Sequence, residues 1–194
     1  MEVILEAHRG YLNVRGIRQM LHESIVDPDK PRPSLLKNSV WRKNIHLLKK
    51  YGFSFDLQVY PQQMGQACKL VKEHENLLFI LYHTGQPSRH DKESLQNWRT
   101  GMQSLARFPN VCVKISGLGM FDRNWTIDTI RPFILYTIKT FGVERCMFGS
   151  NFPVDGMMSN YSRLWSACSE ITGDLSHNER HALFCGNAER IYRI

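Results

Sequence analysis

Polar and ionisable side chains follow the short apolar segments of this chain at regular intervals. They comprise an imidazole, two cations, carboxylates, amides and a hydroxyl, which together can bind an anion, polarise a carbonyl group and move a proton. A purely structural sheet does not need them, because buried charges cost several kcal/mol unless they are paired. The side chains are Arg18, Asp56, Gln58, His83, Lys114, Ser116, Asn151 and Asp155. We expect them to converge on one site.

His83 is the strongest single candidate. It ends the apolar segment 77–82, and the residues that follow, 84–87, read Thr-Gly-Gln-Pro and predict a sharp loop. A neutral imidazole in such a place can ligate a metal ion or transfer a proton. The alternative is a buried histidine that is satisfied by a neighbouring backbone carbonyl. The other polar groups at strand ends favour the functional interpretation.

Arg18 and Lys114 are cations within expected strands. Arginine suits bidentate binding of a carboxylate, and lysine supplies a point charge. The alternative is an internal ion pair with Asp56, which would then be a structural partner instead of a catalytic acid. Gln58 shares a face with Asp56, because side chains alternate along a strand. Asp155 lies in a loop, where capping of the following helix is the alternative to a catalytic role.

Short apolar segments alternate with longer segments of helical spacing. Strands are expected at 14–20, 53–59, 77–82, 111–116 and 146–149, and helices at 34–51, 61–74, 91–108, 127–141, 161–171, 176–184 and 186–192. Ser34 is expected to cap the first of these helices, and Gly52 to end it with a positive φ. Residues 1–13 also have a helix-like pattern.

This alternation predicts an α/β fold with a parallel sheet wrapped by helices. A (β/α)8 TIM-barrel type fits best, because polar residues cluster just past several strand ends. A complete barrel typically needs ~250 residues, whereas this chain has 194 residues. We therefore expect a single barrel domain over residues 1–194 that is incomplete and lacks its N-terminal strands. Such a barrel would leave open sheet edges, which favours pairing with another chain or marginal solubility.

The composition excludes several classes of protein. No apolar run approaches the ~18 residues of a membrane span, and the first residues do not resemble a secretory signal. The five cysteines form no CxxC pair, and several lie in apolar segments. Reduced thiols and a cytoplasmic location are therefore expected. The net charge is +7, but the basic residues are dispersed, so an anionic small substrate is favoured over nucleic acid.

Six ordered motifs carry a family resemblance from about Val14 to the end of the chain. They are Gly16-Ile-Arg18, Phe55-Asp-Leu-Gln-Val-Tyr-Pro61, His83-Thr-Gly-Gln-Pro87, Val113-Lys-Ile-Ser-Gly117, Phe148-Gly-Ser-Asn-Phe-Pro-Val-Asp155 and Asn187-Ala-Glu-Arg-Ile-Tyr192. The chain resembles the amidohydrolase-related (amidohydrolase 2) TIM-barrel metal-dependent hydrolases. Within them it is similar to the lactonase-like branch, which includes sugar-acid lactonases and pyrone-dicarboxylate lactonase.

The resemblance implies hydrolysis of a lactone or related cyclic ester of a small anionic or sugar acid. Water would attack the carbonyl carbon while a carboxylate removes its proton. His83 would be a metal ligand or a polarising donor, Arg18 and Lys114 would hold an anionic substrate, and Asn151 would orient water. Asp56, Gln58 and Ser116 would also contact the substrate.

Two departures from the family pattern bear on activity and metal binding. The family opens with a strand carrying His-x-His, which is absent here, and Asn151 stands where relatives usually carry an aspartate. Asparagine cannot take up a proton. Full-length relatives would hold a divalent metal such as zinc, whereas weak or no metal binding is expected in this chain.

The alternative is a catalytically inactive barrel fragment that acts as a scaffold or binding protein. An in-frame His-x-His strand encoded upstream of Met1 would favour the enzyme, and its absence would favour the alternative. We expect a small-molecule partner, a lactone or carboxylate, with neither nucleic acid nor membrane. A homo-oligomer is a further expectation.

Overall fold

The core of the computed structural model is a parallel sheet. The structure describes residues 2–21, 34–87 and 91–194. The strands are β1 (Gly16–Met20), β2 (Ser54–Gln58), β3 (Phe79–Leu81), β4 (Val111–Ile115) and β5 (Cys146–Phe148). They lie side by side in chain order, and every neighbouring pair is parallel. Each strand begins and ends within two residues of the range expected from the sequence, so the predicted α/β sheet is confirmed.

Helices connect the strands, as the alternating pattern predicts. The α-helices are α1 (Glu2–Arg9), α2 (Ser39–Asn44), α3 (Leu47–Lys50), α4 (Met64–Glu73), α5 (Lys92–Ala106), α6 (Leu118–Phe121), α7 (Ile127–Phe141), α8 (Tyr161–Ile171), α9 (His177–His181) and α10 (Asn187–Tyr192). A π-helical segment, η6 (Ala182–Gly186), joins α9 to α10. None of the helices in these described ranges is long and apolar enough to cross a membrane.

The prediction of a single helix over 34–51 is wrong. The segment forms a 3-10 turn, η1 (Leu35–Lys37), followed by α2 and α3. Asn38 has an extended backbone, and its side chain accepts a hydrogen bond from Trp41 N at 2.9 Å, which starts a new helix. Ser34 does not cap with its side chain; its Oγ donates to the Leu21 carbonyl at 2.8 Å. Gly52 has the expected positive φ, 69°.

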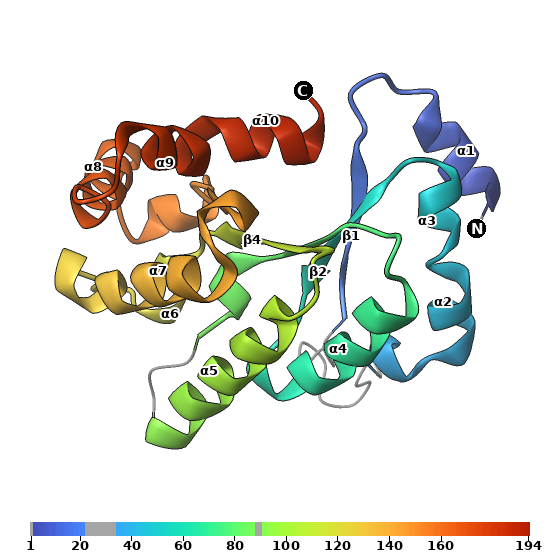
Figure 1. The fold of residues 1–194 in the computed structure, drawn as a ribbon, viewed down its shortest axis with the longest axis horizontal. Helices are drawn as coiled ribbons and strands as arrows, with labels where there is room; N and C mark the ends of the chain where they lie inside the picture. The colour runs from blue at the N-terminus through green and yellow to red at the C-terminus, as the bar shows by residue number, and fades with distance from the viewer. Residues whose placement is uncertain (1, 22–33, 88–90) are drawn as a thin grey trace.

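The two faces of the sheet are covered by different elements. Figure 1 shows α4, α5 and α7 on one side of the strands and α10 across the other. The larger core joins the outward-facing residues Phe55, Phe79 and Val113 to those helices. On the inner face a smaller cluster packs Ile191 of α10 and, partly buried, Tyr192 against strand residues. A helix from the end of the chain therefore covers part of the face that a barrel would turn inward.

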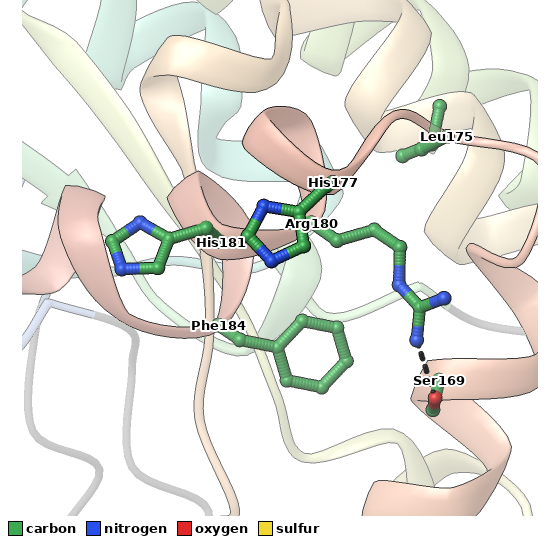
Figure 2. A pocket seen from close by; sticks show the side chains of 6 residues that line it. All are labelled: Ser169, Leu175, His177, Arg180, His181 and Phe184. Atoms are coloured by element: carbon green, nitrogen blue, oxygen red, sulfur yellow. Dashed lines mark hydrogen bonds between the residues drawn. The ribbon is translucent and has the colours of Figure 1, made fainter.

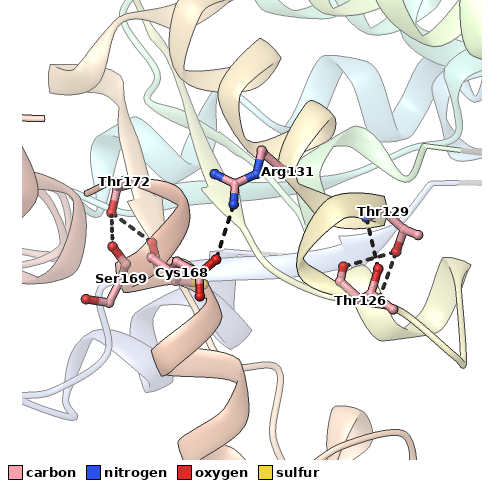
Figure 3. Close-up of polar contacts among 7 residues, drawn as sticks. Thr126, Thr129, Arg131, Cys168, Ser169 and Thr172 are labelled. Carbon is pink, nitrogen blue, oxygen red and sulfur yellow. Dashed lines mark hydrogen bonds and ion pairs between the residues drawn. The ribbon is translucent and has the colours of Figure 1, made fainter. Parts of the chain in front are cut away.

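Helices α7 and α8 are joined by one ion pair as well as by the core, and each helix also has capping bonds of its own. Arg131 of α7 and Glu170 of α8 form an ion pair at 3.4 Å (Figure 3). A capping box of Thr126 and Thr129 begins α7, and Thr172 Oγ1 donates to the Cys168 carbonyl at 2.8 Å where α8 ends. An exposed ion pair contributes at most about 1 kcal/mol, so Arg131 and Glu170 add little to the apolar packing between the two helices.

Candidate active site

The register of the sheet places the predicted polar side chains on its inner face. Arg18 of β1 pairs with Asp56 of β2 in one row across the sheet, and Gln58 lies two residues farther along the same face. Lys114 of β4 pairs with Met147 of β5. The carboxyl ends of parallel strands meet at one edge, so these side chains lie toward the same edge of the sheet; that all the predicted residues form one site stays a prediction.

Tyr82 lies between the two cations. The Arg18 guanidinium lies over its ring at 5.1 Å from the centroid, and Lys114 Nζ lies over it at 4.1 Å. Lys114 Nζ also donates to the Tyr82 hydroxyl at 2.9 Å. The electron-rich face of an aromatic ring attracts cations, so one phenol holds both positive charges near each other. Within the described residues, the alternative of a direct ion pair between Asp56 and either cation does not form.

Asp56 is a half-buried residue whose carboxyl group has unused hydrogen-bonding capacity. Its Oδ1 has no hydrogen-bond partner among the described residues. Burial is the largest effect on the pKa of Asp56 and raises it. The positive charge of Lys114, a hydrogen bond from Tyr82 and the positive charge of Arg18 each lower it. A carboxyl group with a raised pKa is a candidate proton acceptor, because it binds a proton more readily at working pH.

Tyr192 of α10 packs against the inner face of the sheet beside Lys114. Lys114 Nζ lies 5.0 Å from its ring centroid. The Tyr192 hydroxyl is buried without a hydrogen-bond partner in the part of the chain that the structure describes. Burial, and then the nearby carboxylate of Asp56, raise the pKa of this phenol, which therefore stays protonated.

His83 lies at the end of β3 and is only 4% exposed. Its Nδ1 is 3.1 Å from Ser116 Oγ, and its ring stands edge-on to Tyr82 at 4.7 Å between centroids. Burial, followed by Arg18 and Lys114, lowers the pKa of His83 to about 4. The imidazole is therefore neutral at pH 7. Its side-chain partner is Ser116 Oγ and not the backbone carbonyl of the alternative interpretation.

The turn that holds His83 is tightly fixed. His83, Thr84 and Gln86 all have positive φ, between 51° and 56°, a conformation that non-glycine residues seldom adopt. Thr84 Oγ1 lies 3.2 Å from the Ser116 carbonyl, and Trp98 Nε1 donates to the Thr84 carbonyl at 2.9 Å. Strain of this kind often accompanies functional sites, and the surrounding hydrogen bonds hold it in place.

Two glycines make room for the site. A Cβ on Gly149 would lie 3.1 Å from Lys114 Cγ and Cδ, so a side chain there would push the lysine. A Cβ on Gly117, whose φ is 65°, would lie 2.7 Å from His83 Nδ1. Glycine at both positions therefore lets the imidazole and the ammonium lie close to the neighbouring strands.

Asn151 and Asp155 form a separate pair after β5. Asn151 Nδ2 donates to Asp155 Oδ1 at 2.8 Å, and Asp155 is 2% exposed. Burial raises the pKa of Asp155, while this bond and the Gly119 amide lower it. Asp155 does not cap α8, because Asn160 does so. The pair ties the loop after β5 to α6, and its catalytic role stays a prediction.

We call Arg18, Asp56, Tyr82, His83, Lys114 and Ser116 the strand-end cluster. The sequence analysis did not select Tyr82 or Tyr192 as site residues. Tyr82 carries a recognisable signal, because it is two residues after Ile80 at the end of β3 and so shares the inner face. Tyr192 has only a weak signal, since a helix after the last strand does not reveal which face it covers.

The described residues do not fit a metal centre by themselves. A catalytic zinc site usually has three protein ligands, and no group of three or more His, Cys, Asp or Glu side chains in the described ranges could hold a metal ion. His83 has two cations as neighbours, which disfavour a further positive charge. The Asn151 amide is occupied by Asp155.

A second polar region lies away from the strand ends. Helices α8 and α9 and η6 border a hollow of about 580 Å3, lined by Ser169, Leu175, His177, Arg180, His181 and Phe184 (Figure 2). Arg180 donates to Ser169 Oγ at 2.6 Å. We call it the helix hollow. None of the residues predicted from the sequence lines it.

Comparison with known proteins supports the motif resemblance. The chain is 41% identical over 197 residues to the uncharacterized protein y4mH of Sinorhizobium fredii, covering 98% of this chain and 65% of that protein. It is 25% identical over 193 residues to an L-fucono-1,5-lactonase of Burkholderia multivorans, covering 93% and 63% respectively. The chain thus spans less than two thirds of the length of these curated relatives.

The same fold occurs in a solved structure. An amidohydrolase from Burkholderia multivorans, crystallised with bound zinc, superposes with a TM-score of 0.86 at 24% identity. The match covers 100% of this chain and 70% of that one, so the predicted partial barrel of the TIM type is confirmed. The family described as amidohydrolase matches residues 2–194. This match spans nearly the whole sequence and agrees with the six motifs and the fold, and the chain belongs to the amidohydrolase family.

Proposed function

We propose that this chain forms the larger part of a hydrolase that opens lactones of small sugar acids or related anionic acids. The observation that carries the proposal is the strand-end cluster: two cations share one tyrosine beside a half-buried carboxyl group and a neutral imidazole. The lactonase relative from Burkholderia multivorans supports this substrate class.

The residues of the cluster suit the separate parts of ester hydrolysis. Half-buried Lys114, with the exposed Arg18 beside it, would stabilise the negative charge that develops on the carbonyl oxygen, because a preorganised cation in a partly buried site acts strongly on such charge. Neutral His83 would donate a hydrogen bond or orient the substrate without adding positive charge. Asp56, with its raised pKa and unpartnered Oδ1, would take a proton from water.

The proposed reaction is balanced as follows. The water oxygen forms a bond to the lactone carbonyl carbon, and one water proton passes to Asp56. The ring C–O bond then breaks, and the leaving alkoxide takes up that proton. The product is an open hydroxy acid. The described residues give no ground for routing a step through a metal ion, and the cluster's own groups perform each part.

A hydrolysis screen on aldonolactones and pyrone carboxylates tests the proposal. We expect the unmodified chain to open at least one of them, and Asp56→Asn to lower kcat by about 100-fold or more, since amide nitrogen and oxygen cannot accept the proton. Asp174→Asn, which changes an exposed carboxylate, is the matched control. Absence of hydrolysis across the screen, or equal rates in both variants, would favour the inactive binding protein instead.

A further inference from the structure

Helices α5 and α7 lie on the outer side of the sheet (Figure 1), and a cavity lies between them. It has a volume of about 510 Å3, and its lining includes Leu95, Trp98, Arg99, Pro132, Phe133 and Tyr136. We call it the α5–α7 pocket. Its described lining shares no residue with the strand-end cluster or the helix hollow. Cavities of this size with apolar and aromatic walls are typical of small-molecule binding sites.

Three aromatic rings form a preorganised wall of the pocket. The Trp98 ring centroid lies 5.3 Å from that of Phe133 and 5.1 Å from that of Tyr136. Trp98 Nε1 donates to the Thr84 carbonyl at 2.9 Å, and the Tyr136 hydroxyl donates to the Arg99 carbonyl at 3.3 Å. Packing and hydrogen bonds therefore hold the rings in place before a ligand arrives, which lowers the entropic cost of binding a flat ligand.

The charged part of the lining is positive on balance. Lys92 and Arg99 are exposed, and among the described residues neither cation makes an ion pair or a side-chain hydrogen bond. The Arg99 guanidinium lies 5.8 Å from the Tyr136 ring centroid. Asp91 also lines the pocket, but its carboxylate caps α5 and accepts bonds from Ser94 N at 2.6 Å and Ser94 Oγ at 2.8 Å. A ligand would therefore meet two available cations and one carboxylate that is already engaged.

Trp98 connects the pocket to the turn that holds His83. Its ring lines the pocket, while its N–H holds the Thr84 carbonyl of that turn. Thr84 Oγ1 in turn lies 3.2 Å from the Ser116 carbonyl. The pocket thus borders a residue that supports the candidate active site, yet a ligand bound in it would not take the place of a substrate at the strand-end cluster.

We propose that the α5–α7 pocket binds a small aromatic anion at a second ligand site, separate from the proposed hydrolysis. The aromatic ring of the ligand packs against Trp98, Phe133 and Tyr136, and its carboxylate or sulfonate pairs with Arg99 and Lys92. The three rings favour a flat apolar body, because aromatic pairs gain free energy beyond the area that they bury. The two cations favour an anion over a neutral molecule of the same shape.

Calorimetric titration with 2-naphthoate tests the proposal, and the neutral naphthalene-2-methanol is the matched probe. We expect 2-naphthoate to bind about tenfold more tightly than the neutral probe, the usual effect of a charge-assisted hydrogen bond. Arg99→Gln should weaken 2-naphthoate binding about tenfold and leave the affinity for the neutral probe unchanged. Arg107→Gln removes an exposed arginine at the other end of the same helix and should change neither affinity.

Tyr136→Leu provides an independent variant that removes the ring and keeps an apolar side chain. It should weaken the binding of both probes by a similar factor, about threefold to tenfold, because both lose the same aromatic contact. A cooperative melting curve checks that the variant folds. If it does not fold, Arg99→Gln still decides the question, because it changes an exposed side chain.

Two variants in the other cationic regions show where the probe binds. Lys114→Met in the strand-end cluster and Arg180→Met in the helix hollow should leave 2-naphthoate binding unchanged. Loss of binding in either variant, with full binding in Arg99→Gln, would place the probe elsewhere and overturn the proposal.

Three further results would also overturn it. The first is no binding of 2-naphthoate by the unmodified chain at millimolar concentration, and the second is equal affinity for the two probes. The third is a dimer, seen by sedimentation, that Tyr136→Leu converts to a monomer, because the pocket would then be an interface between copies of the chain. None of these measurements requires lactone hydrolysis, so this inference and the proposed function can fail independently.

Discussion

The strand-end cluster and the helix hollow both gather cations and imidazoles, but their surroundings differ. In the cluster, His83 is 4% exposed, and Lys114 is half-buried between the rings of Tyr82 and Tyr192. In the hollow, His177 and His181 are exposed, and Arg180 is held by a hydrogen bond from its guanidinium to Ser169. The imidazole of the cluster is therefore buried and those of the hollow are exposed, whereas each region has a half-buried cation.

Residue types alone therefore do not identify a functional site. The hollow has a volume of about 580 Å3. It nevertheless holds no unpartnered buried polar atom among the described residues. The cluster holds one such group, on Asp56, and Tyr192 beside it holds another; the cluster also includes a histidine whose pKa falls to about 4. Residues with shifted pKa values that lie together at the ends of strands indicate a functional site.

The largest expected difference in activity is between two variants that each remove one positive charge, one from the cluster and one from the hollow. Lys114→Met takes away the cation nearest both tyrosines, and we expect kcat/KM for a lactone substrate to fall about 100-fold or more. Arg180→Met removes a charge of the same sign from the helix hollow and should stay within about twofold of the unmodified chain. Equal losses in steady-state assays, or full activity of Lys114→Met, would remove the distinction between the regions.

The buried histidine of the cluster and the exposed histidines of the hollow should also differ in how they change the free energy of unfolding with pH. His83 has a folded pKa near 4 and an ordinary value of 6.5, so between these values the unfolded chain binds the proton first. Stability is complete above about pH 6.5 and is lost as the pH falls toward 4, by on the order of 3 kcal/mol.

Denaturant unfolding at several pH values measures this loss. His83→Asn, which tolerates the positive φ and does not titrate, should reduce the difference in stability between pH 7 and pH 4. His181→Asn in the hollow should leave it unchanged, since that ring is exposed. The raised pKa of Asp56 has the opposite sign and is present in both variants, so the comparison isolates His83. An unchanged pH dependence in His83→Asn would contradict the assignment.

Much of the sheet could be predicted because its cause is local. Apolar runs such as Phe79–Leu81 are buried on both sides, and their hydrophobicity is visible without the fold. The division of segment 34–51 was missed, because Asn38 offers the backbone a capping bond that competes with a continuous helix. The short helix α6 was missed as well, since one turn leaves little periodicity to detect.

The sequence predicted only those site residues whose positions follow from the strands that carry them. The convergence of Arg18, Asp56 and Lys114 follows from parallel register. The position of Tyr82 between the cations, and of Tyr192 above them, depends on side-chain rotation and on where α10 packs. Long-range packing also leaves Gln86 Nε2 unpaired, and no local sequence pattern encodes that.

Metal content gives a smaller but direct test of the cluster. The donor set described above predicts less than one divalent metal ion per chain by elemental analysis of the purified protein. A chelator should then change the melting temperature by no more than about 1 °C, because a ligand that is not bound cannot stabilise the fold. A full equivalent of zinc, with a large drop in melting temperature on chelation, would show that the described residues hold a metal after all.

The smallest expected difference in activity is between two variants that each add one methyl group, Gly149→Ala beside the cluster and Gly186→Ala beside the hollow. Gly149→Ala places a Cβ 3.1 Å from the Lys114 stem, and that stem is confined between two rings, so its ammonium must shift. Gly186→Ala brings a Cβ within 3.2 Å of the exposed His181 ring, which can move into solvent. We expect Gly149→Ala to lower kcat/KM about threefold to tenfold, the result of a small misplacement of a catalytic group. Gly186→Ala should retain activity and gain up to about 1 kcal/mol in stability from helix propensity. If both variants keep full activity, the position of Lys114 tolerates more displacement than the packing between Tyr82 and Tyr192 indicates.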